Sequence, residues 1–415
     1  MSQRGFWKTV LAIALVALLW LGQTLDAAAF TQEQKLLLQA WRIVNQSYVD
    51  ESFNHQNWWL MRQKFLKHRL GNREETYAAI REMLATLDDP FTRLLEPQQY
   101  RSLQVSTSGE LSGVGLQIDL EAETGQLEVV SPIAGSPAEA AGLQPLDRIL
   151  EIDGIPTKNL TLDEAANRMR GPAGTSVRLT VERSGKAGTL AFDIVRDRIP
   201  LNPVYAKLDT TSSDRAIGYV RLSQFSANAT KEVAHAIAKL DQQGAQAYLL
   251  DLRNNPGGLL QAGIQIARFW LNDSTIVYTV NRQGTLGSFD ARHSALTDAP
   301  LVLLVNQGTA SASEILAGAL QDNGRATLVG EKTFGKGLIQ SLFELPDDAG
   351  LAVTVAKYET PSHKDIHKRG IMPDIVVSQE PISWAEVGTE SDKQYQAAVE
   401  ALTAQTVLAE ASEAN

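Results

Sequence analysis

One stretch of the sequence carries two hydroxyl groups, either of which could attack an acyl carbon. Ser311 and Ser313 follow the apolar run Leu301–Val305, at the point where a helix is expected to begin. A hydroxyl at a helix N-terminus lies in a positive field that favours an alkoxide or oxyanion. Ser311 could equally cap the helix, because Glu314 follows at the spacing of a capping box. Position alone leaves both interpretations open, with Ser313 as a rival nucleophile.

A serine nucleophile needs a base, and a lysine is one candidate. Lys336 lies between two glycines, which allow close backbone packing that could enclose its amine. An amine in water has a pKa of about 10.4, so burial would have to lower it by ~3 units. The alternative is an exposed loop lysine. The six histidines indicate no triad, and His363 and His367 lack a third ligand, so we expect no metal site.

A third segment, Asp251–Gly258, leads from an expected strand through a Pro-Gly-Gly turn into a helix. Free N–H groups at such a turn can bind an anion. The alternative is a plain strand-to-helix turn, because two adjacent glycines alone are weak evidence.

Composition narrows the class of protein. The chain has 415 residues, a formal net charge of −10 and no cysteine. The length suits two or three domains. The absence of cysteine excludes disulfides, thiolate metal sites and a cysteine nucleophile. An acidic chain without basic blocks predicts no nucleic-acid partner.

The first 29 residues have the pattern of a signal peptide. Arg4 and Lys8 precede the apolar run Val10–Leu21, and the small residues Ala27–Ala29 follow it. The alternative is an uncleaved anchor, but the run falls short of the roughly 20 residues that span a bilayer. We expect cleavage after residue 29 and export.

The remaining chain divides by its patterns into four parts: a helical region over 30–104, a β-rich domain over 105–198, an α/β domain over 199–383 and a helical tail over 384–415. Asn72 is expected to cap a helix in the first part, and Thr161 one in the second. Trp41, Trp58 and Trp59 are expected to be buried in the helical packing.

Taken together, the motifs closely resemble the C-terminal processing (tail-specific) peptidase family. The segments that carry the resemblance are 309–315, 330–337, 251–258 and 370–374. The resemblance implies an α/β core of the crotonase/ClpP-like type with a Ser-Lys dyad and without a cofactor or metal. It places the nucleophile on Ser311 rather than Ser313 and the base on Lys336.

The resemblance also implies the supporting residues. Gln340 would be the partner of Lys336, on the same face of an extended strand. The backbone N–H groups of Gly257 and Ala312 would form the oxyanion hole. Asp322 matches an acidic helix residue sometimes grouped with the dyad, although we expect its role to be more structural than chemical.

The β-rich domain resembles a PDZ module. Gly113, Val114, Gly115 and Leu116 look like its carboxylate-binding loop, which would hold a peptide C-terminus while the next strand accepts the peptide as an added strand. A glycine usual in a later turn is replaced by Leu146, which should alter that turn only. The module could swing on its linkers and gate the site.

Within the family, residues 76–81 and 87–93 look like the cyanobacterial and chloroplast branch. This likeness implies an endopeptidase that removes the C-terminal extension of the photosystem II reaction-centre precursor (the D-one subunit). It also implies a monomer in the thylakoid lumen or periplasm, compatible with peripheral membrane association. The alternatives are a general tail-specific quality-control protease and a non-catalytic PDZ scaffold.

Overall fold

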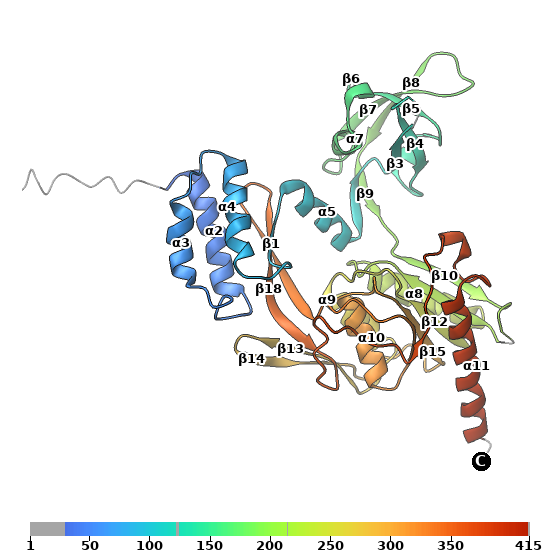
Figure 1. Cartoon of the computed structure of the whole chain (residues 1–415). Coiled ribbons are helices and arrows are strands. Elements are labelled where there is room, and N and C mark those ends of the chain that lie inside the picture. Colours follow the sequence, from blue (N-terminus) through green and yellow to red (C-terminus); the bar gives the residue numbers. More distant parts are fainter. Residues whose placement is uncertain (1–29, 122–123, 214, 414–415) are drawn as a thin grey trace, which may run out of the picture. The chain divides into compact units, whose positions relative to one another are not determined.

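The computed structural model describes residues 30–413 except 122–123 and 214 (Figure 1). The predicted signal peptide, residues 1–29, lies outside the described residues. The chain divides into two compact units, Met1–Pro97 with Gln340–Thr354, and Gln98–Ile339 with Val355–Asn415. None of the helices in the described part of the chain has the length and apolarity to cross a membrane.

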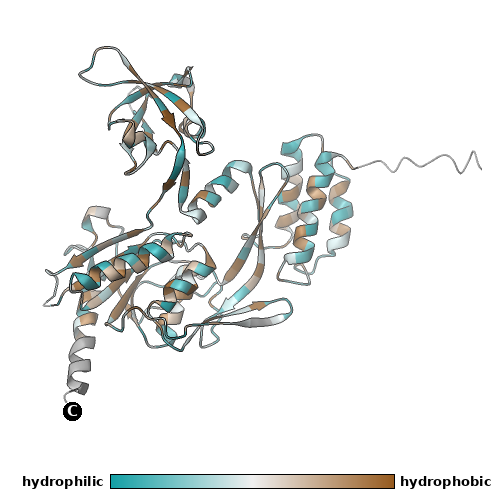
Figure 2. Cartoon of the chain, turned by 180° about the vertical axis from the view of Figure 1, so that it is seen from behind, coloured by the Kyte–Doolittle hydropathy of each residue, from teal (hydrophilic) through white to brown (hydrophobic). Residues whose placement is uncertain are grey.

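The first unit contains three helices, α2 (Gln32–Ser47), α3 (Trp58–Leu66) and α4 (Arg73–Ala85), which pack against one another (Figure 1). Each begins at a polar cap, because a side-chain oxygen of Thr31, Asn57 or Asn72 accepts a backbone N–H of the first turn. The predicted cap at Asn72 is confirmed. Figure 2 shows hydrophobic and hydrophilic stripes alternating around these helices, as expected of helices that bury one face.

The tryptophans of this unit divide between core and surface. Trp41 and Trp58 are buried, and the Trp41 indole N–H donates to the carbonyl of Trp58. Trp59, however, is 58% exposed, so its predicted burial is wrong. Successive residues of a helix point about 100° apart, and therefore Trp58 and Trp59 cannot both face the same core.

A β-hairpin forms at residues 338–359. Strand β17 (Leu338–Glu344) pairs with β18 (Gly350–Glu359). In the first unit, the start of β18 pairs with β1 (Arg93–Leu95). In the second unit, its end pairs with β13 (Thr275–Asn281), which in turn pairs with β14 (Gly284–Asp290).

The second unit begins with α5 (Pro97–Ser108), most of which belongs to it, and continues into a β-rich domain. The main sheet has the order β3-β4-β5-β7-β8, and β6 (Ile155–Pro156) pairs with β5. Its strands are β3 (Leu116–Leu120), β4 (Leu127–Pro132), β5 (Arg148–Ile152), β7 (Ser176–Glu182) and β8 (Thr189–Val195). A separate ribbon pairs β2 (Glu110–Gly113) with β9 (Asp197–Pro200). The domain has its own apolar core.

Two helices accompany this sheet, α6 (Pro137–Ala140) and α7 (Leu162–Met169). The predicted capping box of α7 is present, because Thr161 and Glu164 each accept the other's backbone N–H. Ala165 and Met169 of this helix join the core of the domain.

The rest of the second unit is built on a six-stranded sheet with the order β10-β11-β12-β15-β16-β19. Its strands are β10 (Val204–Asp209), β11 (Ile217–Leu222), β12 (Ala247–Asp251), β15 (Leu301–Val305), β16 (Thr327–Gly330) and β19 (Ile375–Val376). Only β10 is antiparallel to its neighbour.

Helices cover both faces of this sheet, which explains the continuous apolar run of β15. Leu301 and Leu303 pack in one cluster with α8 (Ala229–Gln242), α9 (Leu260–Arg268) and α10 (Ala312–Asp322). Val302 and Leu304 pack in another with the first part of α11 (Lys393–Glu413). The helical tail predicted from the sequence is confirmed as α11, and it closes the second face.

Candidate active site

Three loops follow neighbouring strands of the six-stranded sheet. The loops after β12, β15 and β16 carry Gly257, Ser311 and Lys336, respectively. These strands are adjacent and parallel, so their carboxyl ends lie at one edge of the sheet, where α/β proteins place their sites. The tertiary structure therefore gathers three loops that are up to 79 residues apart in the sequence, since 336 − 257 = 79.

Ser311 occupies a sharp turn between β15 and α10. Its φ is 58°, a region that costs a non-glycine residue about 1–3 kcal/mol. The residue is half-buried, and its carbonyl accepts hydrogen bonds from the Tyr358 hydroxyl and from the backbone N–H of Glu314. A strained turn between strand and helix is also how other hydrolase folds present a nucleophilic serine.

The rival Ser313 lies in a different environment. Its side chain is fully buried, and its hydroxyl donates to the carbonyl of Asn255 at 3.0 Å. An enclosed hydroxyl that already donates to the backbone is poorly placed to meet a substrate. This contact favours Ser311 over Ser313.

Glu314 connects the serine loop to the lysine loop. Its buried carboxylate accepts the backbone N–H groups of Ser311 at 2.9 Å, Gly335 at 2.7 Å and Lys336 at 2.8 Å. It also accepts the hydroxyl of Thr333 at 2.6 Å. A carboxylate has enough lone pairs for these four donors. The sequence indicated Glu314 only as the second half of a capping box, and its reach into the distant lysine loop was missed.

Lys336 is half-buried in a loop that the backbone holds tightly. A Cβ on Gly335 would lie 2.8 Å from the nitrogen of Gly370, and one on Gly337 would lie 2.8 Å from the nitrogen of His367. Gly335 also has a φ of 90°, which favours glycine. The glycines beside Lys336 thus allow the close approach of a neighbouring segment, in the way the sequence suggested.

Gly257 lies directly against the serine loop. A Cβ there would be 2.9 Å from both the Cβ of Ser311 and the nitrogen of Ala312. The predicted oxyanion donors are therefore neighbours of Ser311. The Gly257 N–H donates to Oδ1 of the buried Asn255 at 2.9 Å, so an oxyanion would have to compete with that amide. No pattern in the sequence indicated this contact.

Asp322 lies at the opposite end of α10 from Ser311. Its carboxylate accepts hydrogen bonds from the ammonium of Lys364 at 2.9 Å and from the backbone of Ser362 at 3.0 Å. Burial by itself raises the pKa of Asp322, but the bonds from Lys364 and Ser362 outweigh it and bring the pKa to about 2. These contacts agree with the structural role expected from the sequence.

Gln340 lies in β17, which begins at Leu338. Lys336 therefore precedes the strand, and the prediction that the two residues share a strand face is wrong. The Nε2 of Gln340 is enclosed without a hydrogen-bond partner among the described residues. Its pairing with Lys336 stays a prediction.

A buried ion cluster supports the loop that carries Gly257. The guanidinium of Arg253 is 2.7 Å from carboxylate oxygens of both Asp251 and Asp392. The Tyr219 hydroxyl also donates to Asp251. This cluster joins the end of β12 to the start of α11. Sequence reasoning missed it because Asp392 is 139 residues from Arg253.

The predicted carboxylate-binding loop lies between β2 and β3. Gly115 has a φ of 78°, and a Cβ there would be 2.4 Å from the Cβ of Ser136, so the position requires glycine. Strand β3 is at the end of the sheet order, so one of its edges faces no strand of the described chain. An exposed edge is what a peptide needs in order to add as a strand. Leu146, the departure from the usual glycine, has a φ of 67° in its turn.

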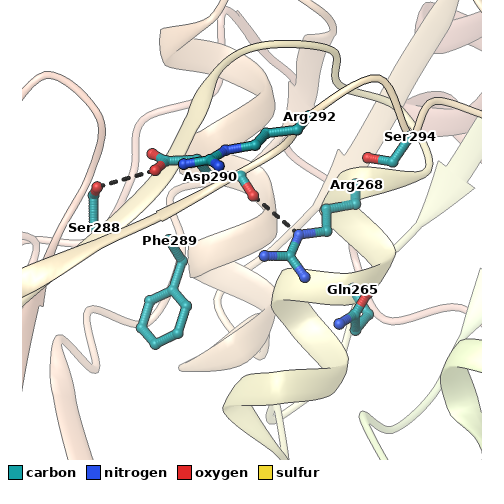
Figure 3. A pocket seen from close by; sticks show the side chains of 7 residues that line it. All are labelled: Gln265, Arg268, Ser288, Phe289, Asp290, Arg292 and Ser294. Carbon is teal, nitrogen blue, oxygen red and sulfur yellow. Dashed lines mark hydrogen bonds between the residues drawn. The ribbon is translucent and has the colours of Figure 1, made fainter.

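A pocket of about 570 Å³ lies elsewhere in the second unit (Figure 3). Its lining includes Arg268, Asp290 and Arg292 and none of the predicted site residues. Arg268 donates through Nε to the carbonyl of Asp290. This pocket is therefore separate from the predicted site, whereas another pocket of the second unit includes Asp322 in its lining.

Comparisons with known proteins agree with this architecture. The model of peptidase family S41 matches residues 216–377, and a PDZ domain model matches residues 128–183. The carboxyl-terminal-processing protease of Synechocystis sp. is 66% identical over 409 residues, which cover 99% of this chain and 96% of that protein. The chloroplastic carboxyl-terminal-processing peptidase 2 of Arabidopsis thaliana is 46% identical, over 83% of this chain and 68% of that protein.

A solved structure is similar over most of the chain. The photosystem II D1 C-terminal processing protease is 39% identical with a TM-score of 0.56, and the match covers 88% of this chain and 100% of that one. Fold and matches together define a peptidase that joins an α/β catalytic core to a PDZ domain and a helical N-terminal region.

The chain belongs to peptidase family S41, as a serine-type protease that processes the carboxyl termini of proteins. The expected fold class, enzyme class and family are thereby confirmed, and the alternative of a non-catalytic scaffold is removed. The two family models fall inside the predicted domains 105–198 and 199–383, whose boundaries stay predictions, as does the crotonase/ClpP-like character of the core.

Proposed function

We propose that Ser311 is the nucleophile of this protease and that neutral Lys336 is its general base. The observation that carries the proposal is the shared carboxylate of Glu314, which accepts the backbone N–H groups of both residues. In this mechanism Lys336 takes the hydroxyl proton as Ser311 attacks the scissile carbonyl. The oxyanion binds the N–H groups of Gly257 and Ala312, and its collapse breaks the scissile C–N bond as protonated Lys336 gives its proton to the departing amine, which leaves the acyl-enzyme. Lys336 then takes a proton from the attacking water and returns it to the Ser311 oxygen as the acyl group leaves as a carboxylic acid.

The proposal extends to the substrate. We infer that the PDZ loop at 113–116 captures the free C-terminus of the photosystem II reaction-centre precursor, whose extension is then removed in the thylakoid lumen or periplasm. The similar solved structure is named as a photosystem II D1 C-terminal processing protease, which supports this substrate. The Arabidopsis thaliana relative is named as chloroplastic, which supports the compartment. Peripheral membrane association, a monomeric state and gating by the PDZ module belong to the same proposal.

A general tail-specific protease is the second candidate. The exposed edge of β3 favours it, because strand addition relies on main-chain hydrogen bonds that any extended tail can supply. Rates of cleavage of the reaction-centre tail peptide and of unrelated peptides of equal length separate the two. Equal kcat/KM for all peptides would establish the general protease, whereas a strong preference for the reaction-centre tail supports the specific one.

The dyad is tested by Ser311→Ala and Lys336→Ala, each of which should abolish product formation measured by mass spectrometry. Lys332→Ala is the matched control, because Lys332 is an exposed lysine of the same loop. Circular dichroism and the melting temperature should show a retained fold in all three variants. Normal cleavage by Ser311→Ala or Lys336→Ala would overturn the assignment.

A further inference from the structure

We propose that one face of helix α3 docks the protein on an anionic lipid surface. This face, called the α3 face below, consists of Trp59, Leu60, Gln63, Lys64 and Lys67, all of which are exposed. They recur at steps of three and four residues and therefore share one side of the helix. The opposite side packs inward through Trp58 and Phe65, which are 3% and 0% exposed.

The N-terminal half of the α3 face is apolar. Trp59 and Leu60 are each 58% exposed and adjacent in the chain. Single exposed apolar residues are ordinary, but a tryptophan beside a leucine on the outer side of an already packed helix is less so. Indole rings are enriched where protein meets the membrane interface, because an apolar body carries a polar N–H.

The indole of Trp59 is held in place rather than loose. Its ring centroid is 5.1 Å from that of Trp41, and the guanidinium carbon of Arg62 lies 5.4 Å from the same ring. Arg62 also lies 5.3 Å from the ring of Trp41. These contacts reduce the conformational entropy that the side chain would lose on binding.

The C-terminal half of the α3 face is basic. Residues 57–73 contain five lysines and arginines and no aspartate or glutamate, in a chain with a net charge of −10. Arg73 is paired with Asp347, and Arg69 lies 3.9 Å from Glu75. Within the described residues, neither Lys64 nor Lys67 has a carboxylate within 4.0 Å. The ammonium of Lys64 lies 5.1 Å from the ring of Phe65, a contact that does not neutralise its charge, so both lysines can still attract an anionic partner.

Charge and residue type favour lipid over a protein partner. Helices that lie on membranes combine basic residues with Trp and Leu, and each basic residue near an anionic surface adds about 1 kcal/mol of attraction. Protein interfaces, by contrast, are depleted in lysine. An anionic bilayer accepts the indole and leucine at its interface and the two ammonium groups at its headgroups.

Co-sedimentation of the full chain with lipid vesicles tests the proposal. Vesicles of phosphatidylcholine mixed with phosphatidylglycerol should bind the protein at low ionic strength, and vesicles of phosphatidylcholine alone should bind it at least tenfold less. Added salt should weaken binding to the anionic vesicles. Absence of binding to anionic vesicles at low salt would overturn the proposal.

Matched variants locate the surface. The pair Lys64→Glu and Lys67→Glu, and separately Trp59→Ala, should each lower the partition coefficient, the charge pair by more than tenfold. The control pair Lys158→Glu and Lys186→Glu changes the net charge equally at exposed lysines of the β-rich domain and should bind almost normally. Leu296→Gln, which alters a residue 50% exposed in the second unit, controls for Trp59→Ala.

Equal losses in the control variants would overturn the α3 face as the docking surface. So would a dimer in analytical ultracentrifugation that Trp59→Ala converts to a monomer, because the face would then join two copies of the chain. All altered side chains are exposed, and the charge variants should keep the melting temperature of the native protein. Trp59→Ala also loses the ring contact with Trp41, so its requirement is a retained cooperative unfolding transition at a slightly lower melting temperature.

Discussion

The carboxylate oxygen Oε2 of Glu314 lies 2.8 Å from the backbone nitrogen of Lys336. The same oxygen lies 2.9 Å from the backbone nitrogen of Ser311. One buried side chain thus sets the separation of the two loops that carry the proposed nucleophile and base. Catalytic geometry depends on such positioning, since a displacement of about 1 Å can lower a rate by 10²-fold.

Replacement of Glu314 by glutamine should impair positioning more than folding. The amide would present a donor to backbone N–H groups that need an acceptor, which costs about 1–3 kcal/mol of stability. We expect kcat on a tail peptide to fall by about 10²-fold while KM changes little, because the PDZ loop captures the tail. Glu164→Gln, at a capping box of the PDZ domain, is the control and should keep normal kcat. An unchanged kcat in Glu314→Gln would contradict this role.

Alanine at Gly257 should disturb the proposed oxyanion hole. Its Cβ would lie 2.6 Å from the carbonyl oxygen of Ala310 and 2.9 Å from the nitrogen of Ala312, so the loop must shift. Losing one oxyanion donor costs roughly 10²–10³ in kcat. The control is Gly244→Ala, where φ is 91° but nothing lies within 4 Å of the added methyl. Similar kcat values for both variants would argue against Gly257 as a donor.

Truncation of Arg253 should destabilise the second unit. Arg253→Ala would leave the carboxylates of Asp251 and Asp392, both fully buried, without their shared cation. Breaking a buried pair in this way costs about 3–5 kcal/mol. Arg178→Ala removes an exposed pair with Asp193 and should cost under about 1 kcal/mol. Urea denaturation measures both, and equal losses would show that the cluster adds nothing beyond a surface pair.

Asp322 should contribute stability that depends on acidity. Its folded pKa of about 2 is below the ordinary value of 3.8, so its contribution is complete above pH 3.8 and is lost as pH falls toward 2. The shift corresponds to about 2 kcal/mol. The stability difference between the native protein and Asp322→Asn should shrink in denaturant titrations as the pH falls from about 5 to about 3, a range that includes the ordinary pKa of 3.8. A difference that stays constant over this range would contradict the lowered pKa.

Local patterns predicted most of the elements. The caps at Asn72 and Thr161 and the apolar run of β15 all depend on residues that are close in the chain. Helix caps and apolar periodicity depend on residues that are a few positions apart, and therefore they can be recognised from the sequence without knowledge of the tertiary structure. Trp59 was placed wrongly because composition says that a tryptophan prefers burial but not which side of a helix the core occupies.

The sequence by itself determined the types and spacing of Ser311 and Lys336, and the resemblance of the surrounding motifs to a peptidase family assigned a Ser-Lys dyad to them. It did not determine which contacts position these two residues. Only the tertiary structure decided that Glu314 connects their loops, that Asn255 occupies the N–H of Gly257 and that Ser313 is enclosed.

The physical reason is the parallel sheet. Adjacent parallel strands bring their carboxyl ends to one edge, so side chains from loops far apart in sequence come within hydrogen-bonding distance there. Which hydrogen bonds a buried polar group forms therefore depends on which loops the fold places beside it. The proposed dyad was therefore visible in the sequence as two residues of suitable chemistry, whereas the contacts that support it depend on the fold.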